Sequence, residues 1–149
     1  MKFAIAGAGY IADIHARAIQ NNGGEITAVI EKFADKRTEF ASRFKIPHKF
    51  ESLASALEAV SIDALVIGTP NYLHTPQALA ALKAHIPVLV EKPMAMNARE
   101  AHQMLAVARR HPDARVAVLR FVPILAAERR DYRIRYLEGP VSLTMLGYD

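Results

Sequence analysis

The fold of this chain is decided by FAIAGAGYIA, residues 3–12. A short apolar run meets two glycines, and Ile11, Ile14, Ala18 and Ile19 then recur at helical spacing. This order predicts a buried strand, a tight turn and a helix. The turn has the form GxGxxA, and in this position the form is typical of a turn that holds the diphosphate of a dinucleotide.

Each small residue of the turn has its own physical role. Gly7 permits the tight turn, Gly9 leaves room for a diphosphate, and Ala12 lets the helix pack closely on the strand. The free N–H groups at the start of the helix, and its partial positive charge, favour phosphate. The alternative interpretation is a strand-to-helix turn that binds nothing.

The rest of the chain alternates short apolar runs with longer amphipathic stretches, as a parallel βαβ sheet does. Further strands are expected at 26–30, 48–50, 64–67, 88–90 and 116–119. Ser52 and Thr75 should each cap a helix, and Asn97 with Glu100 should begin another. We therefore expect an α/β fold of Rossmann type, a parallel sheet flanked by helices, over residues 1–121.

Residues 122–149 follow a different rhythm. They predict a helix at 123–137 and a strand at 141–146, which is the expected start of a second α/β domain. An exposed strand at 141–146 would be an unprotected edge, so a homo-oligomer formed through it is a further expectation.

An acidic residue, Glu31, directly follows the strand at 26–30. A carboxylate here accepts hydrogen bonds from both ribose hydroxyls and repels a 2′-phosphate, which favours NAD over NADP. The opposing signal is Lys32, with Lys36 and Arg37 nearby, since these cations could hold that phosphate if Glu31 turned aside. NAD is therefore the predicted cofactor, and NADP is the alternative.

Two later loops should line the same crevice, because ligands bind beyond the carboxyl ends of parallel strands. Thr69 and Asn71 offer hydrogen bonds, whereas His74 either faces the crevice or is satisfied by backbone groups. Glu91 and Lys92 end the next strand. The Lys92 ammonium could orient a hydroxyl or carbonyl substrate, or it could form only a surface pair with Glu91.

Three motifs in register resemble the N-terminal domain of the Gfo/Idh/MocA oxidoreductases. They are AIAGAGYIA at 4–12, TPNYLH at 69–74 and VLVEKP at 88–93. The resemblance implies cofactor contacts from Gly7, Gly9, Tyr10, Ile11, Glu31, Thr69, Pro70, Asn71 and His74. It also implies that Glu91 and Lys92 stand at the nicotinamide end, with Lys92 nearest to a catalytic role.

The resemblance further implies hydride transfer at a CH–OH carbon of a sugar, cyclitol or related polyol. Family members continue with a second domain that supplies an Asp and a His, and this chain ends where that domain begins. We expect cofactor binding with little turnover, because hydride transfer needs a substrate carbon held near the nicotinamide with water excluded. The alternatives are a stand-alone nucleotide-binding or redox-sensing module, and an enzyme completed by a second chain.

Composition bears on other classes of partner. The net charge is +4, but the basic residues are scattered and the densest group, at 129–135, has the spacing of a solvated helix face. Nucleic acid is therefore not expected as a partner. The absence of cysteine excludes disulfides and cysteine-based zinc sites, and no metal is predicted. No segment has the apolar length to cross a bilayer, so no membrane contact and a cytoplasmic location are predicted.

Overall fold

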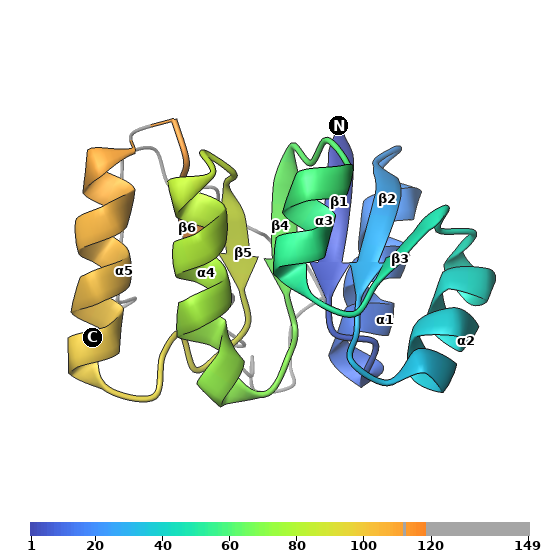
Figure 1. The fold of residues 1–149 in the computed structure, drawn as a ribbon, viewed down its shortest axis with the longest axis horizontal. Helices are drawn as coiled ribbons and strands as arrows, with labels where there is room; N and C mark the ends of the chain where they lie inside the picture. Colours follow the sequence, from blue (N-terminus) through green and yellow to red (C-terminus); the bar gives the residue numbers. More distant parts are fainter. Residues whose placement is uncertain (112, 119–149) are drawn as a thin grey trace, which may run out of the picture.

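The computed structural model describes residues 1–111 and 113–118 of the chain. Within these residues, six parallel strands form one sheet in the order β3-β2-β1-β4-β5-β6. The strands are β1 Lys2–Ala6, β2 Glu25–Ile30, β3 His48–Phe50, β4 Ala64–Ile67, β5 Val88–Val90 and β6 Val116–Val118. Every pair of neighbouring strands is parallel, and the arrowheads of β1, β4 and β5 in Figure 1 point the same way.

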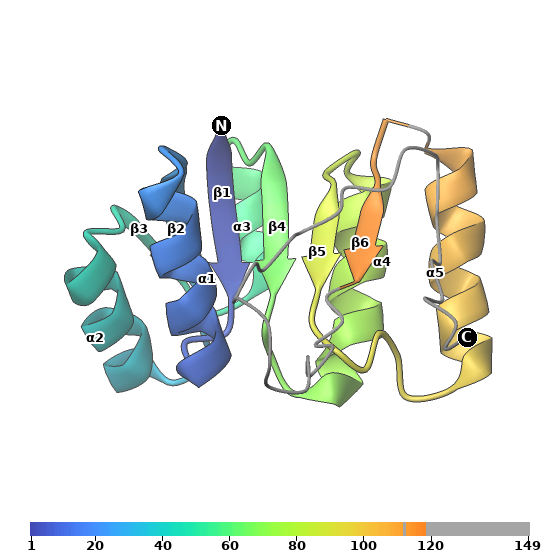
Figure 2. The ribbon, with the colours of Figure 1, turned by 180° about the vertical axis from the view of Figure 1, so that it is seen from behind.

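Helices cover both faces of the sheet (Figures 1 and 2). They are α1 Tyr10–Asn21, α2 Ala34–Phe44, α3 Leu53–Ala59, α4 His74–Lys83 and α5 Ala98–Arg110, with a 3₁₀ turn η1 at Asn71–Leu73. Helices α1 and α2 share one apolar cluster with the sheet, and α3, α4 and α5 share the other. The predicted α/β fold of Rossmann type is thus confirmed over the described residues.

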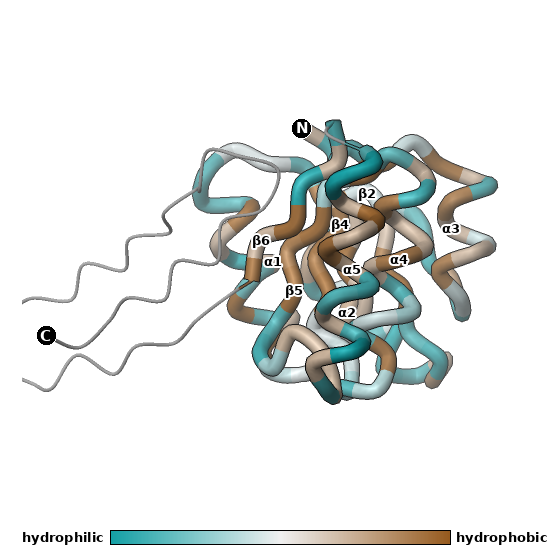
Figure 3. Tube along the Cα trace, turned by 90° about the vertical axis from the view of Figure 1, so that its left-hand side faces the viewer, coloured by the Kyte–Doolittle hydropathy of each residue, from teal (hydrophilic) through white to brown (hydrophobic). Residues whose placement is uncertain are grey.

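Strand β1 illustrates why the central strands are apolar without alternation. Ala4 and Ala6 pack toward α3 and α4, whereas Ile5 packs toward α1 and α2, and all three are fully buried. A parallel strand that is covered on both faces needs apolar residues at every position. Figure 3 shows the result, with hydrophobic segments along strands such as β5 and hydrophilic ones on the outer turns.

The strand order places a crevice beside β1. Strand β2 pairs with one edge of β1 and β4 with the other, so the chain winds away from β1 in two directions. The helices that follow β1 and β4 therefore lie on opposite faces of the sheet, α1 on one and α4 on the other. Open parallel sheets bind ligands at such a point, beyond the carboxyl ends of the strands. The loops that follow β1, β4 and β5 lie at the lower edge of Figure 1.

Two helix starts agree with the sequence prediction and one does not. Ser52 caps α3 by accepting from Ser55 N at 3.2 Å, and Asn97 caps α5 by accepting from Glu100 N at 3.0 Å. The prediction that Thr75 caps α4 is wrong. Helix α4 begins at His74 because η1 runs directly into it, and the Thr75 hydroxyl instead donates to the Glu100 carboxylate at 2.9 Å.

The buried face of α1 differs from the one that the isoleucines suggest. Its buried residues are Ala12, His15 and Ala16, whereas Ile14 is 43% exposed and Ala18 is exposed. The helix lies so close to the sheet that small side chains fill the contact. Ile11 and Ile14 lie beside the crevice instead, whereas Ile19 packs, partly buried, against the apolar cluster of α1 and α2.

Several predictions fall outside the described residues. These are the last residue of the strand at 116–119, the second domain at 122–149 and the edge strand at 141–146. In the part of the chain that is described, no helix combines the length and the apolar character that crossing a membrane requires.

Candidate functional site

The first strand-to-helix turn lies against the loop that follows β4. Gly7 has a φ of +99°, and a Cβ built on it would lie 2.7 Å from the carbonyl oxygen of Gly68. Both the backbone angle and the neighbouring loop therefore require glycine at this position. Gly7 is needed by the chain itself, whether or not a ligand binds.

Gly9 stands in a different situation. Its φ of −90° and ψ of −172° suit any residue, and a Cβ built on it would meet nothing within 4 Å. Gly9 is the residue that caps α1, and no side chain caps this helix. The open space above Gly9 thus faces N–H groups that have no partner inside the helix, an arrangement that favours an anion.

A hollow of about 430 Å³ adjoins this turn. Its lining residues are Ala8, Gly9, Tyr10, Asp13, Lys36, Glu39 and Arg43. The Asp13 carboxylate would oppose an anion here, but it pairs with Arg17 and with Arg43 at 2.7 Å each. These arginines compensate its charge, and Lys36 adds a cation to the same hollow.

Glu31 lies at the carboxyl end of β2, beside the glycine turn. Its carboxylate accepts from Ala8 N at 3.2 Å and from Phe33 N at 3.0 Å. These two contacts hold the acid between the first turn and the start of α2. The sequence placed Glu31 at this corner but gave no sign of either contact.

The cations near Glu31 are partly engaged by the chain itself. The Arg37 guanidinium donates to the carbonyl oxygens of Glu31 and Lys32. The Lys36 ammonium lies 5.3 Å from the centre of the Phe33 ring, and Lys32 is exposed. Among these three residues, Arg37 is the one whose side chain is hydrogen-bonded to main-chain carbonyl oxygens.

A second hollow, of about 470 Å³, lies at the other side of Tyr10. It is lined by Tyr10, Ile11, Ile14, Thr69, Asn71, His74, Glu91 and Lys92. The structure thus brings together the predicted residues of α1, of the loop after β4 and of the end of β5. The exposed Pro70 belongs to the same loop. Gly9 borders the first hollow, and Gly7 and Glu31 lie near it at the glycine turn.

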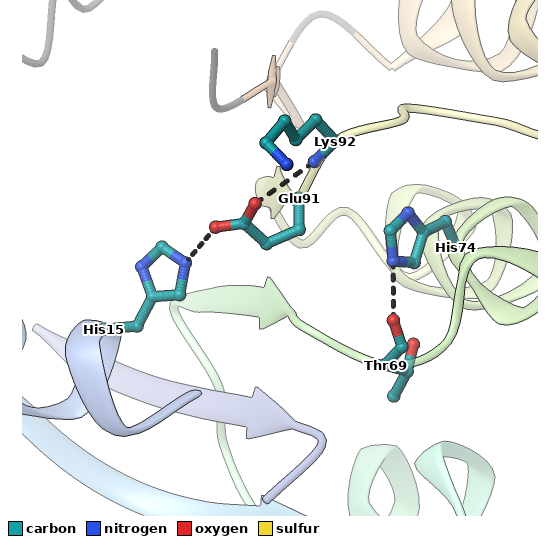
Figure 4. Close-up of polar contacts among 5 residues, drawn as sticks. All are labelled: His15, Thr69, His74, Glu91 and Lys92. Atoms are coloured by element: carbon teal, nitrogen blue, oxygen red, sulfur yellow. Dashed lines mark hydrogen bonds and ion pairs between the residues drawn. The ribbon is translucent and has the colours of Figure 1, made fainter. Parts of the chain in front are cut away.

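His74 is held by backbone groups, which is one of the two roles that its sequence position left open. It is 1% exposed, and its ring nitrogens lie 2.8 Å from the carbonyl oxygens of Pro93 and Thr69. Figure 4 shows the contact with Thr69. The ring therefore joins the loop after β4 to the loop after β5, and His74 is one of the residues that line the second hollow.

Glu91 is also buried, at 7% exposure, and its partner is a residue that sequence reasoning missed. One carboxylate oxygen lies 2.8 Å from His15 Nε2, and the other accepts from the main-chain N–H of Lys92 at 3.2 Å (Figure 4). A surface pair between Glu91 and the Lys92 ammonium is therefore the wrong interpretation. Lys92 itself is exposed, and its peptide bond to Pro93 is cis.

The signal for His15 was present but ambiguous. It falls on the helical face of Ala12 and Ala16, the spacing of a buried position. A histidine on such a face has many possible partners, and local spacing does not choose among them.

The comparison with protein families decides the wider class. A family model described as "Oxidoreductase family, NAD-binding Rossmann fold" (GFO_IDH_MocA) matches residues 1–119. The chain belongs to this family.

Curated relatives of this family member include the uncharacterised oxidoreductase YgjR of Escherichia coli, 34% identical over 110 residues. Another is the scyllo-inositol 2-dehydrogenase (NADP(+)) IolU of Bacillus subtilis, 32% identical over 110 residues. Each match covers 73% of this chain and 34% of the relative, so the chain spans about a third of their length.

A solved relative agrees in fold. The WlbA dehydrogenase from Bordetella pertussis, solved in complex with NADH and UDP-GlcNAcA, superposes with a TM-score of 0.76 at 28% identity. The superposition covers 79% of this chain and 36% of that one. The similarity thus includes an enzyme that was crystallised with a nicotinamide coenzyme.

Proposed function

We propose that this chain binds NAD(H) across the crevice beside β1, with the diphosphate at the glycine turn and the nicotinamide near Lys92. We further propose that it serves an enzyme that oxidises or reduces a CH–OH carbon of a sugar, cyclitol or related polyol. The family, with relatives named inositol dehydrogenases, supports this substrate class.

The observation that carries the proposal is the contrast between Gly7 and Gly9. The fold requires glycine at position 7, because its φ is positive and Gly68 leaves no room for a Cβ. The fold does not require glycine at position 9, because its φ and ψ suit any residue and the space around it is open. A glycine that the fold does not require, at the start of a helix, is best explained by a ligand that must approach the backbone.

The ribose end supports NAD more than NADP. Glu31 stands beside the turn, and two main-chain N–H groups hold its carboxylate in place. A carboxylate fixed here would accept hydrogen bonds from the ribose hydroxyls and would repel the negative charge of a 2′-phosphate. Arg37, one of the cations that could offset this charge, is engaged with carbonyl oxygens.

The nicotinamide end offers groups for positioning a substrate. When bound, the coenzyme supplies the carbon that accepts or donates a hydride. From this chain, the Lys92 ammonium would donate a hydrogen bond to the substrate oxygen, and Thr69 and Asn71 border the same hollow. Ile11 and Ile14 give that hollow an apolar wall.

The test is a fluorescence titration of the purified chain with NADH, repeated with NADPH. We expect saturable binding of NADH and weaker binding of NADPH. Tighter binding of NADPH would contradict the choice of NAD, and the absence of binding by either would contradict the proposal as a whole.

A second candidate function is coenzyme binding without turnover, as a module or a partner of another chain. It is favoured by the exposure of Lys92, and of Ile14 at 43%, because hydride transfer requires a shielded site. A dehydrogenase assay over polyols and sugars distinguishes the two. Turnover that is lost in Lys92→Ala while NADH still binds supports the enzyme, and NADH binding without any turnover supports the module.

A further inference from the structure

We propose that His15 is a positioning residue for the nicotinamide end of the crevice. Through the Glu91 carboxylate it holds the main chain of Lys92, and so it links helix α1 to the residue placed nearest to the substrate. The expected effect on NADH binding rests on the proposed function, but the effect of His15 on Lys92 can be tested without a coenzyme.

The contacts form a short chain from α1 to the end of β5. His15 lies in the second turn of the helix that begins at the glycine turn. Its Nε2 atom is 2.8 Å from Glu91, a residue 76 positions away, and the second Glu91 oxygen accepts from Lys92 N at 3.2 Å. Figure 4 shows the three side chains in sequence, with His74 and Thr69 apart from them.

Because this contact is buried, the Glu91 carboxylate depends on donors from the protein. The side chains of His15 and Glu91 are each 9% exposed, so the carboxylate has little access to water. A buried carboxylate needs hydrogen-bond donors, and an acceptor that loses one tends to move toward a new donor. Because the same carboxylate holds Lys92 N, such a movement would shift the main chain that carries the lysine.

Packing alone does not require an imidazole here. The neighbouring buried residues of α1 are Ala12 and Ala16, and a leucine has a volume similar to that of histidine. Buried polar pairs often add no net stability over apolar side chains of similar volume. Their presence is better explained by what they hold in place, which here is the strand end that bears Lys92.

The experiment uses the full chain with His15→Leu, which removes the donor, and His15→Gln, which keeps an N–H group. His102→Leu is the matched control, since His102 is an exposed histidine on α5. Two properties are measured for each variant. One is the ¹³C resonance of dimethylated Lys92, assigned through its loss in Lys92→Arg; the other is the Kd for NADH and for ADP-ribose, which lacks the nicotinamide.

We expect His15→Leu to shift the Lys92 resonance and to raise the Kd for NADH about tenfold, with less than about a twofold change for ADP-ribose. His15→Gln should restore both properties in large part, and His102→Leu should change neither. If His15→Leu does not fold, His15→Ala removes the same donor without adding volume.

An unchanged Lys92 resonance in the donor-free variant would overturn the inference. So would an equal weakening of NADH and ADP-ribose, since that result indicates a general structural role. If the unmodified chain binds neither ligand, the proposed function fails, and the Lys92 resonance alone decides the role of His15.

Discussion

The two ends of the crevice are built in different ways. At the glycine turn, the useful features are main-chain N–H groups and the empty space above Gly9. At the end of β5, they are side chains buried against one another, His15 with Glu91 at 2.8 Å, and a lysine held through its main chain. The glycine turn depends on the absence of a side chain at Gly9, whereas the end of β5 depends on the contact between His15 and Glu91.

The difference predicts different sensitivities. Adding a side chain should damage the glycine turn, whereas at the β5 end the damaging change is the removal of a hydrogen-bond donor. Stability and binding should also separate within the glycine turn itself, because Gly7 serves the fold and Gly9 serves the proposed ligand.

The largest effect is expected from Gly9→Val. The side chain would occupy the open space and cover the N–H groups at the start of α1, so the Kd for NADH should rise by about 100-fold or more. Fluorescence titration measures this change, and circular dichroism should show an unchanged fold. Retained NADH affinity would mean that the diphosphate does not lie at this turn.

Gly7→Ala should act on stability. Its positive φ and the contact of 2.7 Å with the Gly68 carbonyl oxygen predict a loss of about 3 kcal/mol in the free energy of unfolding. Urea denaturation measures the loss, with Gly9→Ala as the matched control, which should cost less than about 1 kcal/mol because alanine is a poorer N-cap than glycine. Equal losses for the two variants would remove the distinction between the glycines.

Glu31→Ala should reduce the discrimination between the coenzymes. Loss of the carboxylate removes the acceptor for the ribose hydroxyls, so the Kd for NADH should rise about tenfold and that for NADPH much less. Parallel titrations give both values. Glu39→Ala is the control, because Glu39 lines the first hollow with its side chain 77% exposed and should affect neither coenzyme strongly.

The smallest effect is expected away from the crevice, at Thr75→Val. The Thr75 hydroxyl is the leading cause of the lowered pKa of Glu100, ahead of the Met96 N–H. Its removal should raise the pKa of Glu100 toward the ordinary value, as measured by NMR titration of the carboxyl carbon. NADH affinity should stay unchanged, since this carboxylate lies outside both hollows.

The same contact gives a direction for the pH dependence of stability. A carboxyl whose pKa is lowered by folding contributes stability above its unfolded pKa and loses it as the pH falls through the folded pKa. The Thr75→Val variant should therefore lose less stability on acidification than the unmodified chain. A larger acid-induced loss in the variant would contradict the assigned cause.

Local features were predictable because their causes are local. The apolar runs located the strands, and Ser52 and Asn97 each accept from an N–H three residues later, as N-caps do. Thr75 failed as a cap because its hydroxyl found Glu100, 25 residues away, and because η1 leads directly into α4. The apolar spacing of α1 suggested a face led by isoleucines, whereas close packing on the sheet selected the alanines.

The sequence by itself determined that a strand, a glycine turn and a helix stand at the start of a parallel α/β fold, because spacing and glycine positions act over a few residues. Only the tertiary structure decided that Gly9 faces open space while Gly7 does not, and that Glu91 meets His15. Those facts depend on the sheet order that sets the loops after β1, β4 and β5 side by side. Contacts across such distances arise from packing and leave no periodic trace in the chain.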